Sequence, residues 1–396
     1  MLSSLLQKSV QQYIADHEGD DINTLLLKGE TVHGVGTRDL AEQIAGRRKA
    51  KDKLPYLYSS KNIIYPPKLP MEQCSSEFTA MYKSQLIKGS SIADLTGGAG
   101  VDSYFFSRHF KHVYYVEKNQ DLASISAHNF KALRAENVMV YSGRAEDFLS
   151  SNTKKLDAIY LDPARRDSNK NKVFKFSDCT PDVIGMLPKL FESVKTIMVK
   201  ASPMIDITQG IKELSNVEYV YVIAVENECK EVIYVMDRDY KSEFKVICSN
   251  YNKKLSWNEF QFNTEDESLV ESNYSLPLKY IYEPNAAILK AGAFKSFGHH
   301  YKLKKLEVNS HLYTSDKLIE YLPGRAFELI EILTYNKKII KTAIPPGKAN
   351  VATRNFPDSV ESIRKKTGLK PGGKDYLFAT TLMNGKKVLL LTKKTG

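Results

Sequence analysis

Between residues 91 and 202 the sequence alternates short apolar runs with segments of helical character. Strands separated by helices run parallel in one sheet, because a crossover helix returns the chain to the same edge. Residues 217–239 break this pattern, since two long β runs joined by a polar turn predict an antiparallel hairpin. The sequence therefore predicts an α/β fold, a doubly wound sheet closed by that hairpin. The runs that predict parallel strands are 91–96, 112–118, 138–143, 156–163 and 196–202.

The segments that flank this sheet have a different character. Residues 1–70 are predicted to be helical, with apolar side chains at helical spacing over residues 2–14, and YPPKLP at 65–70 is predicted to be a linker. The stretch from 240 to about 275 predicts an extension or linker. The last third predicts an α+β module, with two strands joined by the Asn384-Gly385 turn. We expect four parts, residues 1–70, 71–275, 276–319 and 320–396.

The basic residues are concentrated at one end of the chain. The whole chain has a formal charge of +11, yet residues 276–396 hold 22 Lys and Arg against 9 Asp and Glu. The preceding 275 residues are close to neutral, at −2. Clustered Lys and Arg suit a polyanion, because neutralising phosphates is what they do best. The sequence thus predicts that nucleic acid binds the C-terminal third.

Several classes of protein are disfavoured by what the sequence lacks. No apolar run approaches the roughly 18 residues that a membrane span needs, and the first residues predict an amphipathic helix instead of a signal peptide. The four cysteines are far apart in sequence, and no HExxH motif occurs. We expect a cytoplasmic protein without a membrane partner or a bound metal.

A glycine-rich loop, DLTGGAGVD at 94–102, follows the first predicted strand. A P-loop would end in GK[ST], which is absent here. The dinucleotide fingerprint G-x-G-x-x-G fails at its third position, where Ser103 stands, although Glu117 keeps that reading partly open. Acidic residues also follow the third and fourth predicted strands, in SGRAED and LDPARR. All of these lie at carboxyl ends of strands, where open α/β sheets bind ligands.

This constellation, over residues 72–240, resembles the class I S-adenosylmethionine-dependent methyltransferases, which have a seven-stranded, Rossmann-like sheet. The resemblance implies S-adenosylmethionine as the cofactor. Thr96, Gly97, Gly98 and Gly100 would form the wall beside its amino acid moiety, with Asp94 facing the ammonium through water or backbone. The other implied cofactor contacts are Glu117 on the ribose diol, Lys118 near the adenine, and Ala145 or Asp147 at the adenine amine, since Arg144 stands where the family often has Asp.

The tetrad Asp162-Pro163-Ala164-Arg165 is similar to the (N/D)PP(Y/F) motif of amine-methylating relatives. That likeness makes Asp162, Pro163 and Arg165 the catalytic candidates. The stacking aromatic is missing from the tetrad, and Phe174 or Phe176 in the following loop would have to supply it. The uridine-C5 RNA methyltransferases have DPPR here, but they need a cysteine after the fifth strand, where this chain has Lys200-Ala201-Ser202. The glycine loop itself looks most like that of a small-subunit rRNA guanine-N2 methyltransferase group.

The substrate side is predicted from basic and aromatic residues. Residues 164–176 interleave both kinds, which suits phosphate contact with base stacking. The C-terminal third resembles a small ferredoxin-like segment followed by a THUMP-like domain. The sequence favours methyl transfer to tRNA or rRNA, at an exocyclic amine such as guanine N2. A small-molecule or protein methyltransferase, or a non-catalytic RNA-binding protein, stays possible. The candidate substrate contacts are Arg166, Lys172, Phe174, Phe176 and Lys200.

Overall fold

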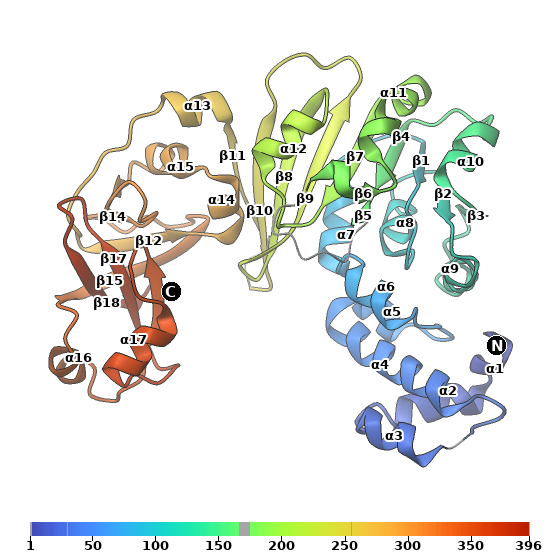
Figure 1. The fold of residues 1–396 in the computed structure, drawn as a ribbon, viewed down its shortest axis with the longest axis horizontal. Helices are drawn as coiled ribbons and strands as arrows, with labels where there is room; N and C mark the ends of the chain where they lie inside the picture. Colours follow the sequence, from blue (N-terminus) through green and yellow to red (C-terminus); the bar gives the residue numbers. More distant parts are fainter. Residues whose placement is uncertain (1, 30, 166–174, 255, 396) are drawn as a thin grey trace. The chain divides into compact units, whose positions relative to one another are not determined.

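The computed structural model describes residues 2–29, 31–165, 175–254 and 256–395 (Figure 1). The chain divides into two compact units. Unit 1 comprises Met1–Val220 and Lys230–Ser242, and unit 2 comprises Tyr221–Cys229 and Glu243–Gly396. The candidate site lies entirely within unit 1.

Unit 1 begins with a helical region, as the sequence predicts. Buried Val10, Ile14 and Ile44 belong to one apolar cluster that joins these helices, and Arg47 pairs with Glu18 at 3.0 Å. Residues 68–70 of the predicted 65–70 linker form the first half of a helix. The helices are α1 (Leu2–Leu5), α2 (Lys8–Asp16), α3 (Ile22–Lys28), α4 (Thr37–Lys53), α5 (Pro55–Ser59), α6 (Lys68–Gln73) and α7 (Glu77–Lys83).

The predicted doubly wound sheet with a terminal hairpin is confirmed. Five strands pair in parallel in the order β7-β4-β1-β2-β3. Strand β9 (Glu228–Asp237) then pairs antiparallel with β7, and β8 (Val217–Val225) follows it in the sheet. The parallel strands are β1 (Ser91–Asp94), β2 (His112–Glu117), β3 (Val138–Ser142), β4 (Ala158–Leu161) and β7 (Thr196–Ala201).

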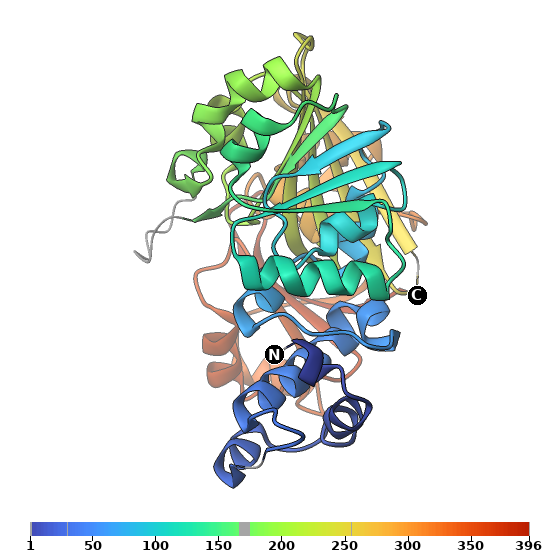
Figure 2. The same cartoon turned by 90° about the vertical axis from the view of Figure 1, so that its right-hand side faces the viewer.

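Helices cover both faces of this sheet because successive residues of a strand point to opposite sides. On β2, Tyr114 packs against Phe148 of α10, and the next residue, Tyr115, packs edge-on against Phe130 of α9. Figure 2 shows α9 running across one face of the strands. The covering helices are α8 (Val101–Phe106), α9 (Gln120–Ala132), α10 (Ala145–Ser151), α11 (Val183–Ser193) and α12 (Ile207–Glu213).

Of the two predictions for the stretch after residue 240, an extension or a linker, the structure shows the extension. β10 (Lys245–Asn252) and β11 (Ser256–Asn263) pair antiparallel in full register, and α13 (Thr264–Leu269) follows them. They extend the sheet to nine strands, in the order β11-β10-β8-β9-β7-β4-β1-β2-β3. Their Ser, Asn and Glu content obscures the alternation of buried residues such as Val246, Phe260 and Phe262.

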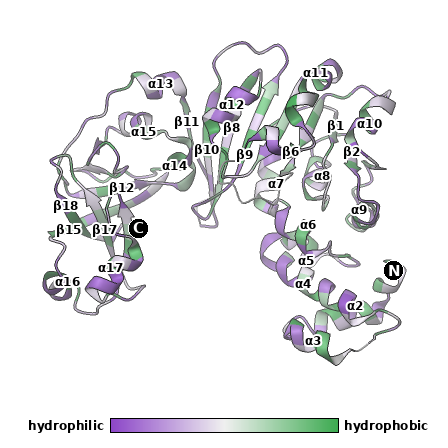
Figure 3. Cartoon of the chain, in the orientation of Figure 1, coloured by the Kyte–Doolittle hydropathy of each residue, from purple (hydrophilic) through white to green (hydrophobic). Residues whose placement is uncertain are grey.

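The rest of unit 2 is the predicted α+β module, built on a sheet of order β13-β14-β12-β15-β18-β17-β16. Ile281, Phe327 and Phe378 form its core on one face, and α17 carries both hydrophilic and hydrophobic residues (Figure 3). The predicted strands about Asn384-Gly385 are the antiparallel pair β17 and β18. The elements are β12 (Tyr280–Pro284), α14 (Ala286–Ala291), α15 (Phe294–His300), β13 (Lys304–Lys305), β14 (Tyr313–Ser315), β15 (Gly324–Leu333), α16 (Lys337–Ala343), β16 (Asn350–Arg354), α17 (Val360–Thr367), β17 (Asp375–Thr381) and β18 (Lys387–Lys394).

Candidate active site

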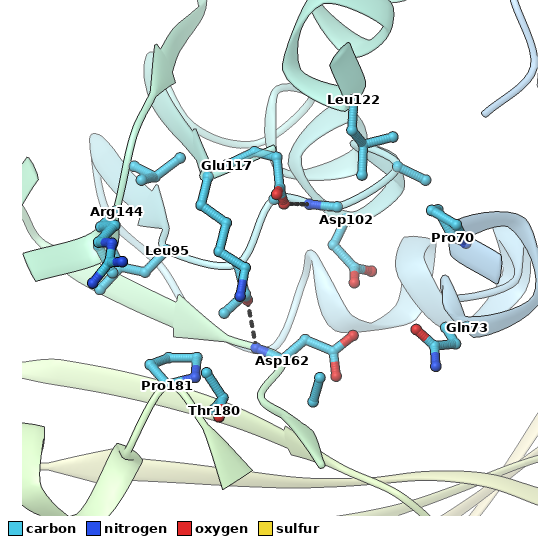
Figure 4. Close-up of a pocket in the computed structure, with 18 of the residues that line it drawn as sticks. Pro70, Gln73, Leu95, Asp102, Glu117, Leu122, Arg144, Asp162, Thr180 and Pro181 are labelled. Atoms are coloured by element: carbon cyan, nitrogen blue, oxygen red, sulfur yellow. Dashed lines mark hydrogen bonds between the residues drawn. The ribbon is translucent and has the colours of Figure 1, made fainter. Parts of the chain in front are cut away.

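A cavity of about 450 Å³ lies at the carboxyl ends of β1 to β4 (Figure 4). Its walls come from the glycine loop, the ends of β2 and β3, Asp162 after β4, and the segment around α6. This is the edge where the sequence places the ligand, because every parallel strand ends there. The volume is within the usual range of small-molecule sites.

The glycine loop is shaped by close packing and by left-handed backbone. A Cβ on Gly97 would lie 2.3 Å from the ring of Tyr115, so only glycine fits there. Gly98 and Gly100 have φ of 54° and 75°, a region that L side chains disfavour. Gly97 and Gly98 line the cavity, whereas Gly100 caps the start of α8 behind it. The backbone can therefore come close to a ligand.

Asp94 lies beneath this loop instead of in the cavity. Its carboxylate accepts hydrogen bonds from the Ser103 hydroxyl at 2.6 Å and from the Thr96 N–H at 3.1 Å. Burial raises the pKa of Asp94 to about 7, against the effect of these hydrogen bonds. Asp94 thus fixes the loop, and any contact with the cofactor's ammonium would be indirect, through water or the loop backbone, as the resemblance implies.

Glu117 ends β2 and lines the cavity. Its two carboxylate oxygens accept the backbone N–H groups of Gly98 at 2.9 Å and Asn119 at 2.8 Å. Each oxygen keeps a further lone pair for a ligand hydroxyl, and Figure 4 shows the Glu117 side chain at the cavity wall. Lys118 also lines the cavity. Both implied contacts are therefore brought to the site.

After β3 the structure separates the two candidates for the adenine amine. Ala145 lines the cavity together with Arg144 and Glu146, whereas Asp147 is exposed outside it. Because α10 starts at Ala145, residues one position apart point about 100° away from each other. Glu146 is thus a cavity residue that sequence reasoning misses.

The tetrad after β4 places Asp162 at the cavity. Its backbone N–H donates to the Thr96 hydroxyl at 2.6 Å, and its carboxylate forms an ion pair with Lys200. Pro163 is buried, Ala164 lines the cavity, and Arg165 pairs in the two-residue strand β5 (Ala164–Arg165) with β6 (Cys179–Thr180).

The predicted substrate loop is only partly accounted for. Arg166, Lys172 and Phe174 lie outside the described residues. Phe176 is fully buried and packs edge-on against Tyr234, so the prediction that it stacks on a target base is wrong. The alternation of basic and aromatic residues does not indicate that Phe176 belongs to the core, because a sequence pattern alone does not show burial.

Helix α6 and the residue after it supply cavity residues that sequence reasoning misses, Gln73 at the end of the helix and Cys74 directly behind it in sequence. Asp102, on the first turn of α8, is another. In Figure 4 the side chains of Gln73, Asp102 and Asp162 point into the same part of the cavity. Burial raises the pKa of the Cys74 thiol. The cysteine is thus kept protonated, unlike the thiolate that uridine-C5 chemistry needs.

The residues present fit a cationic nucleoside cofactor. Glu117 offers carboxylate oxygens for a ribose diol, the Gly97–Gly98 backbone permits close approach, and Asp102 and Asp162 place negative charge nearby. These are the features by which S-adenosylmethionine, a sulfonium ion, would be held. No group of His, Cys, Asp and Glu suited to a metal occurs among the described residues.

The chain is 31% identical to a candidate methyltransferase from Porphyromonas gingivalis W83, whose crystal structure it matches over 98% of its own length and 97% of the other chain. The TM-score is 0.88. The chain belongs to this methyltransferase family. An uncharacterized S-adenosylmethionine-dependent methyltransferase from two strains of Mycobacterium tuberculosis is 22% identical over 312 residues, 76% of this chain and 80% of the relative.

Three family descriptions match parts of the methyltransferase. Residues 75–179 match conserved hypothetical protein 95, residues 280–323 a ferredoxin-like domain, and residues 324–394 a THUMP domain-like family. The resemblance to a class I methyltransferase with a C-terminal THUMP-like module is therefore confirmed. Within the described part of the chain, no helix has the length and apolar character to span a membrane.

Proposed function

We propose that this methyltransferase acts on RNA, tRNA or rRNA, at an exocyclic base amine such as guanine N2. S-adenosylmethionine, the cofactor of its family, supplies a methyl group made electrophilic by the sulfonium. Glu117 would hold the ribose diol, and the backbone of Gly97 and Gly98 would flank the amino acid moiety. Arg144, Ala145 and Glu146 line the cavity where the adenine would lie.

Asp162 would orient the amine. Its carboxylate and the carbonyl of Pro163 accept hydrogen bonds from the two N–H groups, which turns the nitrogen lone pair toward the methyl carbon. The new N–C bond forms as the C–S bond breaks, the electron pair stays on sulfur, and the amine proton leaves to water. Positioning and relief of the positive charge on nitrogen do most of the work in such an in-line displacement.

The choice of RNA is supported above all by two neighbouring loops of unit 2. Lys348 and Lys370 face each other in a parallel bridge, closed by hydrogen bonds from Ala349 N–H to the Lys370 carbonyl at 3.0 Å and from Lys370 N–H to the Gly347 carbonyl at 2.8 Å. Lys374 lies in the same second loop. All three lysines are exposed, and none has an ion pair among the described residues. Such unpaired cations suit a phosphate backbone.

The test is methyl transfer from tritiated S-adenosylmethionine to total RNA of a strain that lacks the gene. We expect RNA from this strain to be labelled at one nucleotide, and RNA from the wild-type strain to be labelled far less. Label in protein or in small molecules instead of RNA would contradict the proposal. Salt-sensitive RNA binding without any transfer would show the non-catalytic alternative.

Cofactor binding is tested separately by calorimetry. Glu117→Ala should lower the affinity for S-adenosylmethionine at least about tenfold, since a charge-assisted hydrogen bond is worth roughly 1.5 kcal/mol or more. Asp147→Ala is the matched control, because it removes an exposed carboxylate close in sequence to the cavity residues. Equal affinity for both variants and the wild type would refute the assigned cofactor site.

A further inference from the structure

In the ion pair between Asp162 and Lys200, only Asp162 faces the cavity. Asp162 lines the cavity and its side chain is 31% exposed, whereas the Lys200 side chain is 9% exposed and does not line the cavity. Lys200 reaches the carboxylate from β7, the neighbouring strand in the sheet. The lysine thus contacts Asp162 from behind, which differs from the direct substrate contact that the sequence suggests for it.

Lys200 is itself fixed by a buried polar network. The Ser75 hydroxyl accepts from Lys200 at 3.4 Å and from Lys83 at 2.5 Å, and donates to Asp102 at 2.9 Å. Lys83 is fully buried and pairs with Asp102 at 3.0 Å and with Glu231 at 2.7 Å. Residues from four separate segments of unit 1 therefore hold the two ammonium groups in place.

Within this network, Lys200 is the cation that pairs with Asp162. Lys83 has two carboxylate partners of its own, while the carboxylate in contact with Lys200 is that of Asp162. Without a cation, a carboxylate in this partly buried position would take up a proton more readily, because burial disfavours its charged form. The single Lys200 contact engages one oxygen, Oδ2, and leaves Oδ1 of Asp162 without this partner.

We propose that Lys200 is a positioning residue for methyl transfer, which holds Asp162 as an anion with one oxygen engaged and the other available to the target amine. The inference rests on the proposed function and adds to it the group that keeps Asp162 a hydrogen-bond acceptor. A protonated carboxyl at this position would turn a donor toward the amine, and the nitrogen lone pair would then be misdirected.

Lys200 should therefore affect how the rate of methyl transfer depends on pH. Burial raises the pKa of Asp162, and the Lys200 charge opposes that rise. Without the lysine, Asp162 takes up its proton at higher pH, so activity is lost sooner as the pH falls. The other charged or titratable groups around the pair are Lys53 of α4, Lys83 of α7, Asp102 of α8, Asp94 of β1, Tyr160 of β4, Glu231 of β9 and Cys74 before α7.

The experiment compares pH profiles of kcat for methyl transfer to RNA from the strain that lacks the gene. Lys200→Met should lower kcat about 100-fold, as for other losses of positioning, and should move the acid limb to higher pH. Lys200→Arg should return the limb toward its wild-type position. Lys195→Met is the matched control, because Lys195 directly precedes the same strand, is 56% exposed, and pairs with Asp237 and Asp239. Its profile should equal the wild type.

A second variant guards against a failure of Lys200→Met to fold. Asp162→Asn/Lys200→Met removes both charges, so neither ion is left without its partner. Its acid limb should match that of Asp162→Asn, because the amide does not titrate and Asp94, whose pKa burial raises to about 7, is present in both variants. An unmoved acid limb in Lys200→Met, or an acid limb that differs between the double variant and Asp162→Asn, would overturn the inference. Absence of transfer by the wild type would instead overturn the proposed function.

Discussion

The Thr96 hydroxyl accepts a hydrogen bond from the backbone N–H of Asp162 at 2.6 Å. This bond joins the glycine loop after β1 to the tetrad after β4. Thr96 is held in turn by Asp94, which accepts its N–H and its hydroxyl. The loop assigned to the methyl donor and the residue assigned to the methyl acceptor are therefore parts of one hydrogen-bonded unit.

Thr96→Val should weaken this unit while keeping the shape of the side chain. The Asp162 N–H would lose its acceptor, which costs about 1 to 3 kcal/mol when no water replaces it. We expect a lower free energy of unfolding by chemical denaturation, together with a lower kcat. Thr96→Ser keeps the hydroxyl and is the control. If both variants show the same stability and rate, the bond has no such role.

The glycines of the loop should respond differently to an added methyl group. In Gly97→Ala the Cβ would collide with Tyr115, which is fully buried and donates its hydroxyl to the Gly98 carbonyl at 2.6 Å. Overpacking of this kind costs about 1 to 3 kcal/mol. In Gly98→Ala the Cβ would meet no atom closer than 3.6 Å, and only the φ of 54° is strained.

Denaturation and calorimetry would separate the two variants. Gly97→Ala should be the less stable, and Gly98→Ala should lose affinity for S-adenosylmethionine, because its methyl group would enter the cavity. A Gly98→Ala protein that binds the cofactor as well as the wild type would show that the cofactor does not approach this part of the loop.

Sequence patterns predict the sheet and those residues of the candidate site that lie at strand ends. Glu117 and Asp162 end strands, and strand ends of a parallel sheet must gather at one edge. Cys74 and Asp102 reach the same cavity through tertiary packing, which leaves no local signal. Phe176 has the composition of a base-stacking residue but is buried.

The burial of the two cations Lys83 and Lys200 cannot be predicted from the sequence either, because it too depends on tertiary packing. Lys83 lies on a short helix and Lys200 on a strand, and each reads as a surface lysine until its carboxylate partners are brought together. The strands β10 and β11 do not stand out in the sequence, because polar residues outnumber apolar ones on this antiparallel pair and Ser249 and Asn250 are among its buried residues.

Stability should depend on pH through Asp94. Its pKa is raised from 3.8 to about 7 in the folded protein by burial, so between these values the folded state holds a proton that the unfolded state has released. Stability from this group is therefore greatest below pH 4 and falls as the pH rises toward 7. The Asp94→Asn variant has no titratable group at this position, so its stability lacks this contribution to the pH dependence.

The free energies of unfolding of the wild type and Asp94→Asn should be compared at several pH values by chemical denaturation. The wild-type advantage should shrink with rising pH, at most about 1.4 kcal/mol for each unit, and should level off above about pH 7. Titrations of Asp102 and Asp162 occur in both proteins and cancel in the difference to first order. A difference that stays constant from pH 4 to 7 would contradict the raised pKa.

The two lysine loops of unit 2 should govern the salt dependence of RNA binding. The variant Lys348→Gln/Lys370→Gln/Lys374→Gln removes three exposed cations at the β16 edge of the sheet. For single-stranded RNA each lost phosphate contact lowers the slope of log K against log salt by about 0.7, so the slope should fall by about 2 and the affinity at low salt should drop.

The control removes the same charge from the opposite edge of the same sheet. Lys302→Gln/Lys304→Gln/Lys317→Gln alters exposed lysines around β13 and β14, at the far end of the strand order from β16. Filter binding of total RNA from the strain that lacks the gene, between 50 and 200 mM salt, measures both variants. A control that weakens binding as much as the loop variant would show that net charge alone attracts RNA, and that the two loops form no specific contact surface.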